Sequence, residues 1–120
     1  MALRELMKQF VQAAVRGRQH SVLVETGATE PCRFVLAPNL MAIHLELEGT
    51  IHEVPLKQVK DVFAGRPPKA VAAEGLPAAL DELCSTLVLR NNECVTFRFD
   101  GISERDEFTK CLKVLSLALE

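Results

Sequence analysis

The residues of this chain best suited to chemistry near neutral pH are its three histidines, His20, His44 and His52. None of them stands beside a nucleophile in a pattern typical of a catalytic triad, and the sequence has neither a glycine-rich phosphate loop nor a GxSxG motif. Two of the three fall on neighbouring expected strands. Histidines on such strands most often lie at the protein surface without a ligand. The alternative is a weak metal site built from His44 and His52 with Glu46 or Glu53. We therefore expect no catalysis and no cofactor.

The four cysteines are spread along the chain without a CxxC pair, at Cys32, Cys84, Cys94 and Cys111. Structural zinc sites need repeated Cys/His spacings, so zinc binding is not expected. Three of the cysteines fall on expected strands and one on the apolar side of the expected last helix. We therefore predict buried, reduced thiols that pack as small hydrophobic groups.

Length and charge exclude several classes of protein. A chain of 120 residues fits one globular domain with a single core. The net charge of −2 is unlike the broad basic surface of a nucleic-acid binder, so no nucleic-acid partner is expected. The sequence has no secretory signal and no apolar stretch long enough to span a bilayer. A cytoplasmic, reducing location is the default expectation.

Residues 1–15 are expected to form an amphipathic helix that precedes a domain of residues 16–120. Leu3, Met7 and Phe10 recur at helical spacing on one face. This face could pack on the domain, bind a partner or lie on a membrane surface. Only two basic residues flank the apolar stripe before Arg16, which favours packing or partner contact over membrane contact.

The middle of the chain has the pattern of a β-meander. Segments of strand character are separated by good turn residues, and their ranges are 20–26, 31–37, 41–47, 50–54 and 56–63. Residues 66–74 read as an exposed loop. Leu76, Leu80 and Leu83 then suggest a short helix.

The last third of the chain predicts a hairpin followed by a terminal helix. Val95, Phe97 and Phe99 alternate with polar residues in the second of two strands, 84–90 and 93–100. Asn91-Asn92 suits a two-residue primed turn between them. The helix is expected over 103–120, with a capping-box-like start at Ser103 and Asp106. Its apolar face is formed by Phe108, Leu112, Leu115 and Leu119.

This order of elements predicts an α+β fold. We expect a split β-barrel of two packed antiparallel sheets, about seven strands in all, because a meander, an interrupting loop, a hairpin and a terminal helix follow one another in this order. A split barrel with a different strand order is the alternative, since the pattern does not fix strand pairing. The C-terminal helix caps the barrel, and the N-terminal helix is an addition to it.

The order and spacing of these segments resemble pleckstrin-homology (PH) domains, particularly the phospholipase-C type. The similarity covers residues 17–115 and rests on three runs, at 59–65 (VKDVFAG), 84–90 (CSTLVLR) and 94–115 (CVTFRFDGISERDEFTKCLKVL). Phe108 occupies the place of the tryptophan that is usual in the family. Within this group the chain is most similar to the sub-compartment proteins of the apicomplexan inner membrane complex.

The resemblance implies phosphoinositide binding, but the residues argue against it. The positions expected to hold lysines in the first strand fall on Val22 and Val24, and the position of an arginine in the second falls near Cys32. The loop at 27–30 has no basic residue and ends in Glu30, which repels phosphate. We therefore expect a PH-like domain with weak or no phosphoinositide binding.

The resemblance to the inner-membrane-complex proteins implies a non-catalytic protein-interaction module. It would help organise a sub-compartment of that membrane system during daughter-cell formation, on its cytoplasmic side. In those relatives an acylated N-terminus that begins with glycine, close to a cysteine, gives peripheral membrane attachment. Here Met1 is followed by Ala2 and the first cysteine is Cys32, so either an acylated segment lies outside the given sequence or the narrower resemblance does not hold.

Two sets of residues are candidates for contact with partners. A protein partner of unknown identity would use exposed apolar residues, for which the candidates are Leu3, Met7, Phe10, Met41 and Ile43. The alternative function is binding of phosphoinositides or anionic membranes through a non-standard basic patch. Its residues would be Arg16, Arg18, Arg33, Arg66 and Lys69.

Overall fold

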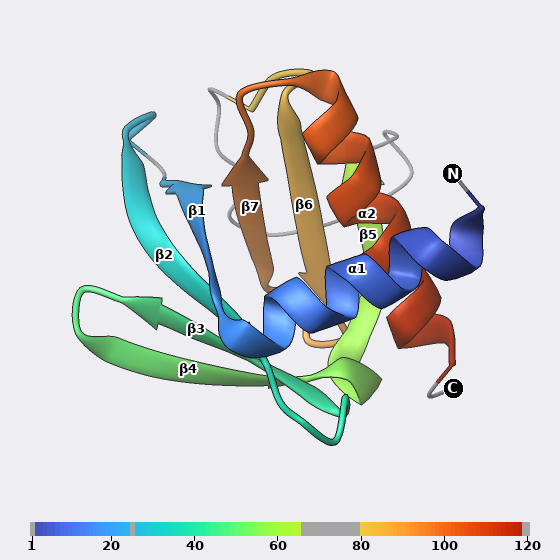
Figure 1. Ribbon diagram of the computed structural model, residues 1–120. Helices are drawn as coiled ribbons and strands as arrows, with labels where there is room; N and C mark the ends of the chain where they lie inside the picture. Colours follow the sequence, from blue (N-terminus) through green and yellow to red (C-terminus); the bar gives the residue numbers. More distant parts are fainter. Residues whose placement is uncertain (1, 25, 66–79, 119–120) are drawn as a thin grey trace.

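The computed structural model describes residues 2–24, 26–65 and 80–118. Helix α1 (Leu3–Arg16) leads into a meander of four strands, and a short 3-10 helix, η1 (Leu56–Gln58), follows it (Figure 1). Three further strands and helix α2 (Ile102–Leu117) complete the chain. The strands are β1 (Arg18–Leu23), β2 (Thr29–Leu36), β3 (Ala42–Leu47), β4 (Thr50–Pro55), β5 (Val59–Ala64), β6 (Cys84–Leu89) and β7 (Cys94–Arg98).

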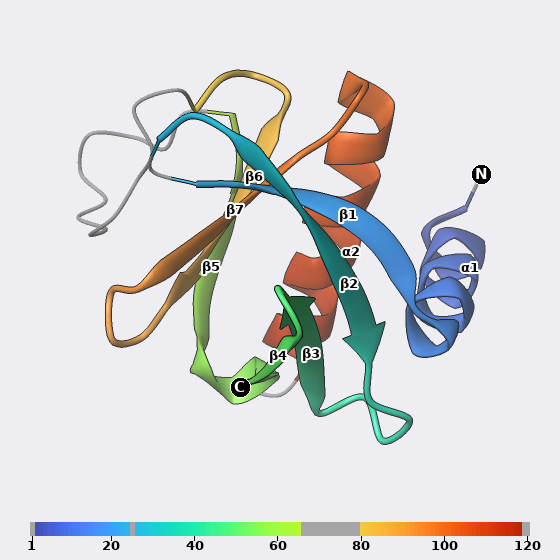
Figure 2. The ribbon, with the colours of Figure 1, turned by 90° about the vertical axis from the view of Figure 1, so that its left-hand side faces the viewer.

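All seven strands belong to one antiparallel sheet in the order β4-β3-β2-β1-β7-β6-β5. Strand β1 joins its two halves, because it pairs with β2 on one side and with β7 on the other. Figure 2 shows the sheet curving so that β3 and β4 lie across from β5, β6 and β7. The edges β4 and β5 leave the barrel split. The expected α+β split barrel is confirmed, and the two expected sheets are the halves of one continuous sheet.

The tight turns follow from residues that tolerate positive φ. Glu48 and Gly49 have φ values of 51° and 79°, as a two-residue primed turn requires, and they connect β3 to β4. The prediction of a two-residue primed turn at Asn91-Asn92 is wrong. Of these two residues only Asn92 has a positive φ, 69°. The Leu89 N–H donates to the Glu93 carbonyl at 2.8 Å, so the loop spans Arg90 to Asn92 and is one residue longer than expected.

Both helices are amphipathic and pack on the barrel. Phe108, Cys111 and Leu112 of α2 are buried, as the periodicity predicts. The predicted capping box is wrong: α2 begins at Ile102 after Gly101, and in the described residues around its start no side chain caps it. Helix α1 packs on β2 and α2, and it buries Phe10 and Ala14 in the same core as the barrel.

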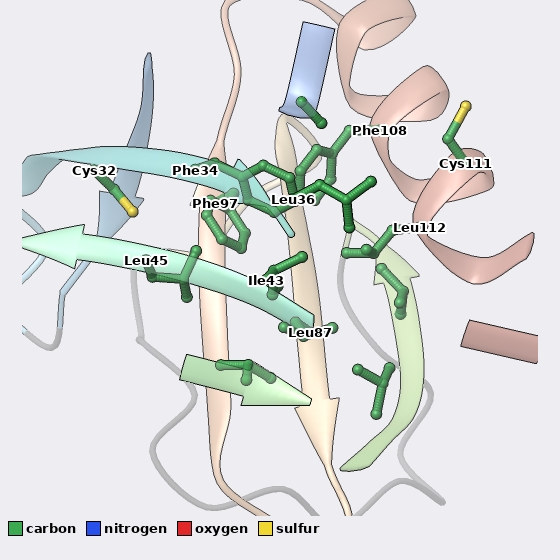
Figure 3. Close-up of a cluster of buried hydrophobic side chains, with 14 of the residues drawn as sticks. Cys32, Phe34, Leu36, Ile43, Leu45, Leu87, Phe97, Phe108, Cys111 and Leu112 are labelled. Carbon is green, nitrogen blue, oxygen red and sulfur yellow. The ribbon is translucent and has the colours of Figure 1, made fainter. Parts of the chain in front are cut away.

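The core is centred on aromatic rings from four elements. The Phe108 ring of α2 lies 5.0 Å from Phe97 of β7 and 5.5 Å from Phe34 of β2, measured between ring centroids (Figure 3). Phe10 of α1 lies 6.2 Å from Phe108 in an edge-to-face arrangement. Such tilted contacts suit the quadrupoles of aromatic rings. Leu36, Ile43 and other aliphatic side chains fill the space around them.

Three of the four cysteines are buried as the sequence predicts. Cys32, Cys84 and Cys111 are buried and Cys94 is half-buried, and these four described cysteines are not joined by disulfides. Burial raises the pKa of Cys32 and of Cys111 to about 11. Thiols with raised pKa values stay protonated and are poor nucleophiles at neutral pH.

Two segments near the β5–β6 connection depart from expectation or lie outside the described chain. The strand expected over 56–63 is wrong in its first part, where Leu56–Gln58 forms η1, and β5 then runs from Val59 to Ala64. The short helix suggested around Leu80 and Leu83 is absent from residues 80–83, which are irregular or in a turn. Leu76 and the expected loop at 66–74 lie outside the described residues.

Candidate functional site

The start of the barrel, at β1 and β2, is where the resemblance places lipid-binding cations. Val22 of β1 is buried and Cys32 of β2 is completely buried, both within the hydrophobic core. Val24 is half-buried. Side chains at these positions therefore pack against neighbouring hydrophobic groups, and a lysine at Val22 or an arginine at Cys32 would have to leave the core to reach a phosphate.

Two carboxylates lie together at the end of the barrel formed by the β1–β2 connection and the β3–β4 turn. The side chain of Glu30, at the start of β2, lies close to that of Glu48 in the turn. The charge of Glu48, together with desolvation, raises the pKa of Glu30. A pair of carboxylates at this position repels phosphate groups. Sequence reasoning named Glu30 but missed Glu48, because their proximity depends on strand register.

The three described arginines of the candidate basic patch only partly come together. The Arg33 Nη2 atom donates to the Arg16 carbonyl oxygen at 3.3 Å, so the Arg33 side chain lies against the end of α1. Arg18 pairs in register with Phe34, whereas Arg33 pairs with Gln19. Because side chains alternate along a strand, Arg18 and Arg33 point to opposite faces of the sheet. Arg66 and Lys69 lie outside the described residues.

Acidic residues surround the exposed face of Arg33. It pairs in register with Glu46 of β3, and it lines a shallow depression together with Gln19, Pro31, Glu46, Glu48 and Gly49. Two carboxylates therefore flank the one arginine of this depression. Such a surface has little net attraction for anions.

The candidate partner surface is partly wrong. Phe10 and Ile43 are buried in the core, so neither can contact a partner in the folded domain. Met7 is half-buried and packs against the core. Leu3 and Met41 are exposed by 45% and 43%, and they remain candidates. The error arises because the periodicity that marks an apolar face is the same for a core-facing and a partner-facing element.

Sequence reasoning also missed an exposed apolar residue on β4. Ile51 is 64% exposed, and most residues of β4, an edge strand, are exposed as well.

The weak metal site considered from the sequence would need His44 and His52 on the same face of the hairpin. On β3, next to β4, His44 pairs with Glu53, and the His44 Nε2 atom lies 3.8 Å from the Glu53 Oε2 atom. His52 pairs with Leu45 and so faces the opposite side of the hairpin. His44 and His52 therefore cannot share a metal ion, and the described residues contain no cluster of three or more potential metal ligands.

His20 has an aromatic environment. Its ring makes edge-to-face contacts with Phe34, Phe97, Phe99 and Phe108, and the closest centroid distances are 5.3 Å. The Nε2 atom is buried and has no hydrogen-bond partner among the described residues. Burial, with a contribution from the charge of Arg18, lowers the pKa of His20 to about 4. His20 is therefore neutral near pH 7 and belongs to the packing of the core.

Comparison with solved structures establishes the fold. The chain superposes on inner membrane complex sub-compartment protein 1 from Toxoplasma gondii with a TM-score of 0.78 and 21% identity, covering 98% of this chain and 95% of that one. Sub-compartment protein 3 from the same organism gives 0.72 at 13% identity, covering 98% and 88%. The PH domain of TgAPH gives 0.62 at 9% identity, covering 96% and 92%. This chain has a PH-like fold. No family model and no curated protein matches its sequence.

The PH-like domain resembles these proteins along nearly its whole length, including the N-terminal helix that precedes the barrel. At such low identity the agreement concerns the path of the backbone, since different side chains can fill the same kind of core. Neither α1 nor α2, within the range that the structure describes, is long and apolar enough to cross a membrane.

Proposed function

We propose that this PH-like domain is a non-catalytic protein-interaction module without the usual phosphoinositide site. It would act at a sub-compartment of a parasite inner membrane complex, on the cytoplasmic side, and help organise that compartment during daughter-cell formation. The similarity to sub-compartment proteins 1 and 3 of T. gondii supports the location. Attachment to the membrane would be peripheral.

The observation that best supports the absence of the lipid site is the chemistry of the β1–β2 end. Phosphoinositide head groups are bound by several converging Lys and Arg side chains. At this end Val22 and Cys32 are buried in the core, and the carboxylates of Glu30 and Glu48 lie together. Where cationic side chains would attract a phosphate group, this end of the barrel has buried apolar side chains and two carboxylates.

The second candidate function is binding of phosphoinositides or anionic membranes through Arg16 and Arg33. Their proximity favours it, since the Arg33 guanidinium lies against the end of α1. Glu46 and Glu48 beside Arg33 argue against it, because they offset the positive charge. Two cations give far fewer phosphate contacts than a specific head-group site needs.

Co-sedimentation with vesicles tests the proposal. The chain is mixed with phosphatidylcholine vesicles, with and without phosphatidylinositol bisphosphate, and the pelleted fraction is compared. We expect no increase with the phosphoinositide. Salt-sensitive pelleting that is lost in Arg16→Glu with Arg33→Gln, but kept in the matched control Lys8→Glu on the exposed face of α1, would establish the second function instead.

Localisation tests the cellular part of the proposal. A fluorescently tagged full chain, expressed in an apicomplexan parasite, should concentrate at the inner membrane complex of forming daughter cells. The tag alone is the control. A diffuse signal identical to that of the tag throughout division would contradict the proposed location.

A further inference from the structure

Among the residues that the structure describes, strand β4 has no neighbouring strand on its outer edge, and the register shows which of its main-chain groups point to that edge. The Leu56 N–H donates to the Met41 carbonyl oxygen at 2.9 Å, and this bond continues the β3–β4 register in which Ala42 pairs with Pro55. Hydrogen-bonded and non-hydrogen-bonded pairs alternate in an antiparallel ladder. Even-numbered residues of β4 therefore bond to β3. The N–H and C=O groups of Ile51 and Glu53 point outward, to the edge where the sheet ends.

A groove lies beside residues 53–55, at the C-terminal end of β4. Its volume is about 240 Å³, and it is lined by Glu53, Val54, Pro55, Gln58, Leu89, Asn91 and Glu93. These residues come from β4, from η1 and from the end of β6 with its following loop, so the groove lies between these three elements. Val54 is buried and Leu89 is half-buried, so both give the groove an apolar floor.

The wall opposite β4 is held in place by two hydrogen bonds from Arg90 to backbone carbonyl oxygens of η1. The Arg90 N–H donates to the Gln58 carbonyl oxygen at 2.8 Å, and the Arg90 Nε atom donates to the Lys57 carbonyl oxygen at 2.9 Å. The β6–β7 loop is therefore fixed to η1. A groove with fixed walls loses less conformational entropy on binding than one that must form.

The side chains that line the groove carry negative charge. Glu53 and Glu93 are exposed, and among the described residues that line the groove none is a lysine or an arginine. Glu53 has a histidine neighbour, His44, which adds positive charge only when it is protonated. An occupant with positive charge is therefore favoured.

We propose that the free edge of β4 and the adjoining groove bind an extended basic peptide segment of a protein partner. The segment would add as a strand to β4, pairing with the outward main-chain groups of Ile51 and Glu53. Its lysine or arginine side chains would reach Glu53 and Glu93, and its apolar side chains would contact Ile51 or Val54. This proposal rests on the proposed function as an interaction module and names the class of its partner.

A second copy of this chain fits the edge less well. Antiparallel pairing of two β4 strands through the same edge would bring the Glu53 side chains of both copies close together. Like charges at directly opposite positions destabilise a sheet, and diagonal positions are still within reach of long side chains. The same acidic groove attracts a basic strand.

The test uses a fluorescein-labelled peptide of about ten residues, the length of a long strand, with lysine alternating with valine or threonine. Its binding to the full chain is measured by fluorescence polarisation and mapped by amide NMR. We expect binding that weakens with added salt, with shifted and exchange-protected amides at Ile51 and Glu53. A peptide with glutamate in place of lysine, and one with proline at alternate positions, should not bind.

Matched variants of the chain separate the proposed site from general charge attraction. The pair Glu53→Lys and Glu93→Lys should weaken binding at least about tenfold, and Glu5→Lys on α1 should change it by less than about twofold. Ile51→Pro removes one outward N–H without touching the ladder to β3, and it should also abolish the amide shift at Glu53. Equal binding to all variants, absent binding, or a dimer that Ile51→Pro dissociates would overturn the proposal.

The two proposals fail separately. A lack of peptide binding, with no phosphoinositide-dependent pelleting of vesicles, overturns the basic-strand site and leaves the interaction module standing. Arginine-dependent pelleting of phosphoinositide vesicles overturns the interaction module, whatever the peptide does.

Discussion

The hydroxyl oxygens of Ser85 on β6 and Thr109 on α2 lie 2.7 Å apart, in the buried contact between the sheet and its capping helix. The Thr109 hydroxyl also donates to the Arg105 carbonyl oxygen at 2.7 Å. A hydroxyl has one hydrogen to give, so Ser85 must be the donor of the shared bond. This pair fixes the orientation of α2 on the barrel by a polar contact inside an apolar interface.

Substitution of Thr109 by valine should lower the free energy of unfolding by about 1 to 3 kcal/mol, because it leaves the Ser85 hydroxyl buried without its acceptor. The double variant Ser85→Ala with Thr109→Val should cost less than the sum of the single variants, since both partners are then apolar. Urea unfolding of the four proteins measures the coupling. Strictly additive losses would mean that the bond contributes nothing to the docking of α2.

The order of elements could be predicted from this sequence because their periodicities are clear. The alternation at Phe97 and the helical spacing at Phe108 and Leu112 each follow from one buried face. Periodicity does not show whether an apolar face packs on the core or is exposed to a partner. Phe10 and Ile43 have the pattern of a partner surface as much as of a core, and only the packing of α1 and β3 on the barrel decides between them.

The candidate site was less predictable than the fold, since it depends on strand register and sheet order. Glu30 and Glu48 are far apart in sequence, and they meet because β2 and β3 pair in one particular register. The free edge of β4 likewise requires the order of strands in the sheet, which a sequence pattern does not give. Register and order come from long-range pairing, outside the reach of local propensity.

Helix α1 should be needed for the stability of the domain. Phe10 is buried among Phe34 and Phe108, so Phe10→Ala should lower the free energy of unfolding by about 3 to 5 kcal/mol. Leu3→Ala, at an exposed position of the same helix, should change it by less than about 0.5 kcal/mol. Thermal unfolding of both variants measures the difference. Equal effects would show that α1 is not packed on the barrel as described.

Gly17, between α1 and β1, should not tolerate a side chain. Its φ is 99°, and a Cβ atom there would lie 2.8 Å from the Arg33 Nη2 atom. Gly17→Ala should therefore cost about 1 to 2 kcal/mol of stability, mainly through backbone strain at the positive φ, since the flexible end of the Arg33 side chain can shift aside.

Gly101→Ala is the matched control, because the space around Gly101 is open and its φ of −149° is extended. We expect a loss of a few tenths of a kcal/mol at this helix start. Chemical denaturation compares the two. A loss at Gly101 as large as that at Gly17 would contradict the assigned role of the positive φ at Gly17.

His20 should make the domain sensitive to mild acid. Its pKa in the folded protein is lowered to about 4, whereas the unfolded chain takes up a proton near 6.5. Below pH 6.5 the unfolded state binds more protons than the folded state, so the free energy of unfolding falls as the pH falls from 6.5 toward 4. Above pH 6.5 His20 is neutral in both states, so it no longer makes the free energy of unfolding depend on pH. The total loss should be on the order of 1 to 3 kcal/mol.

Urea unfolding between about pH 7.5 and pH 4 covers the window between the ordinary histidine pKa and the lowered pKa of His20, and it should show a shallower decline for His20→Leu than for the parent chain. His44→Gln is the control, because His44 lies on the outer face of the β3–β4 hairpin beside Glu53. The carboxylates that titrate in the same range are common to all three proteins, so they cancel in the difference. Parallel pH profiles for the parent chain and His20→Leu would mean that His20 charges without cost and that its aromatic surroundings open readily to water.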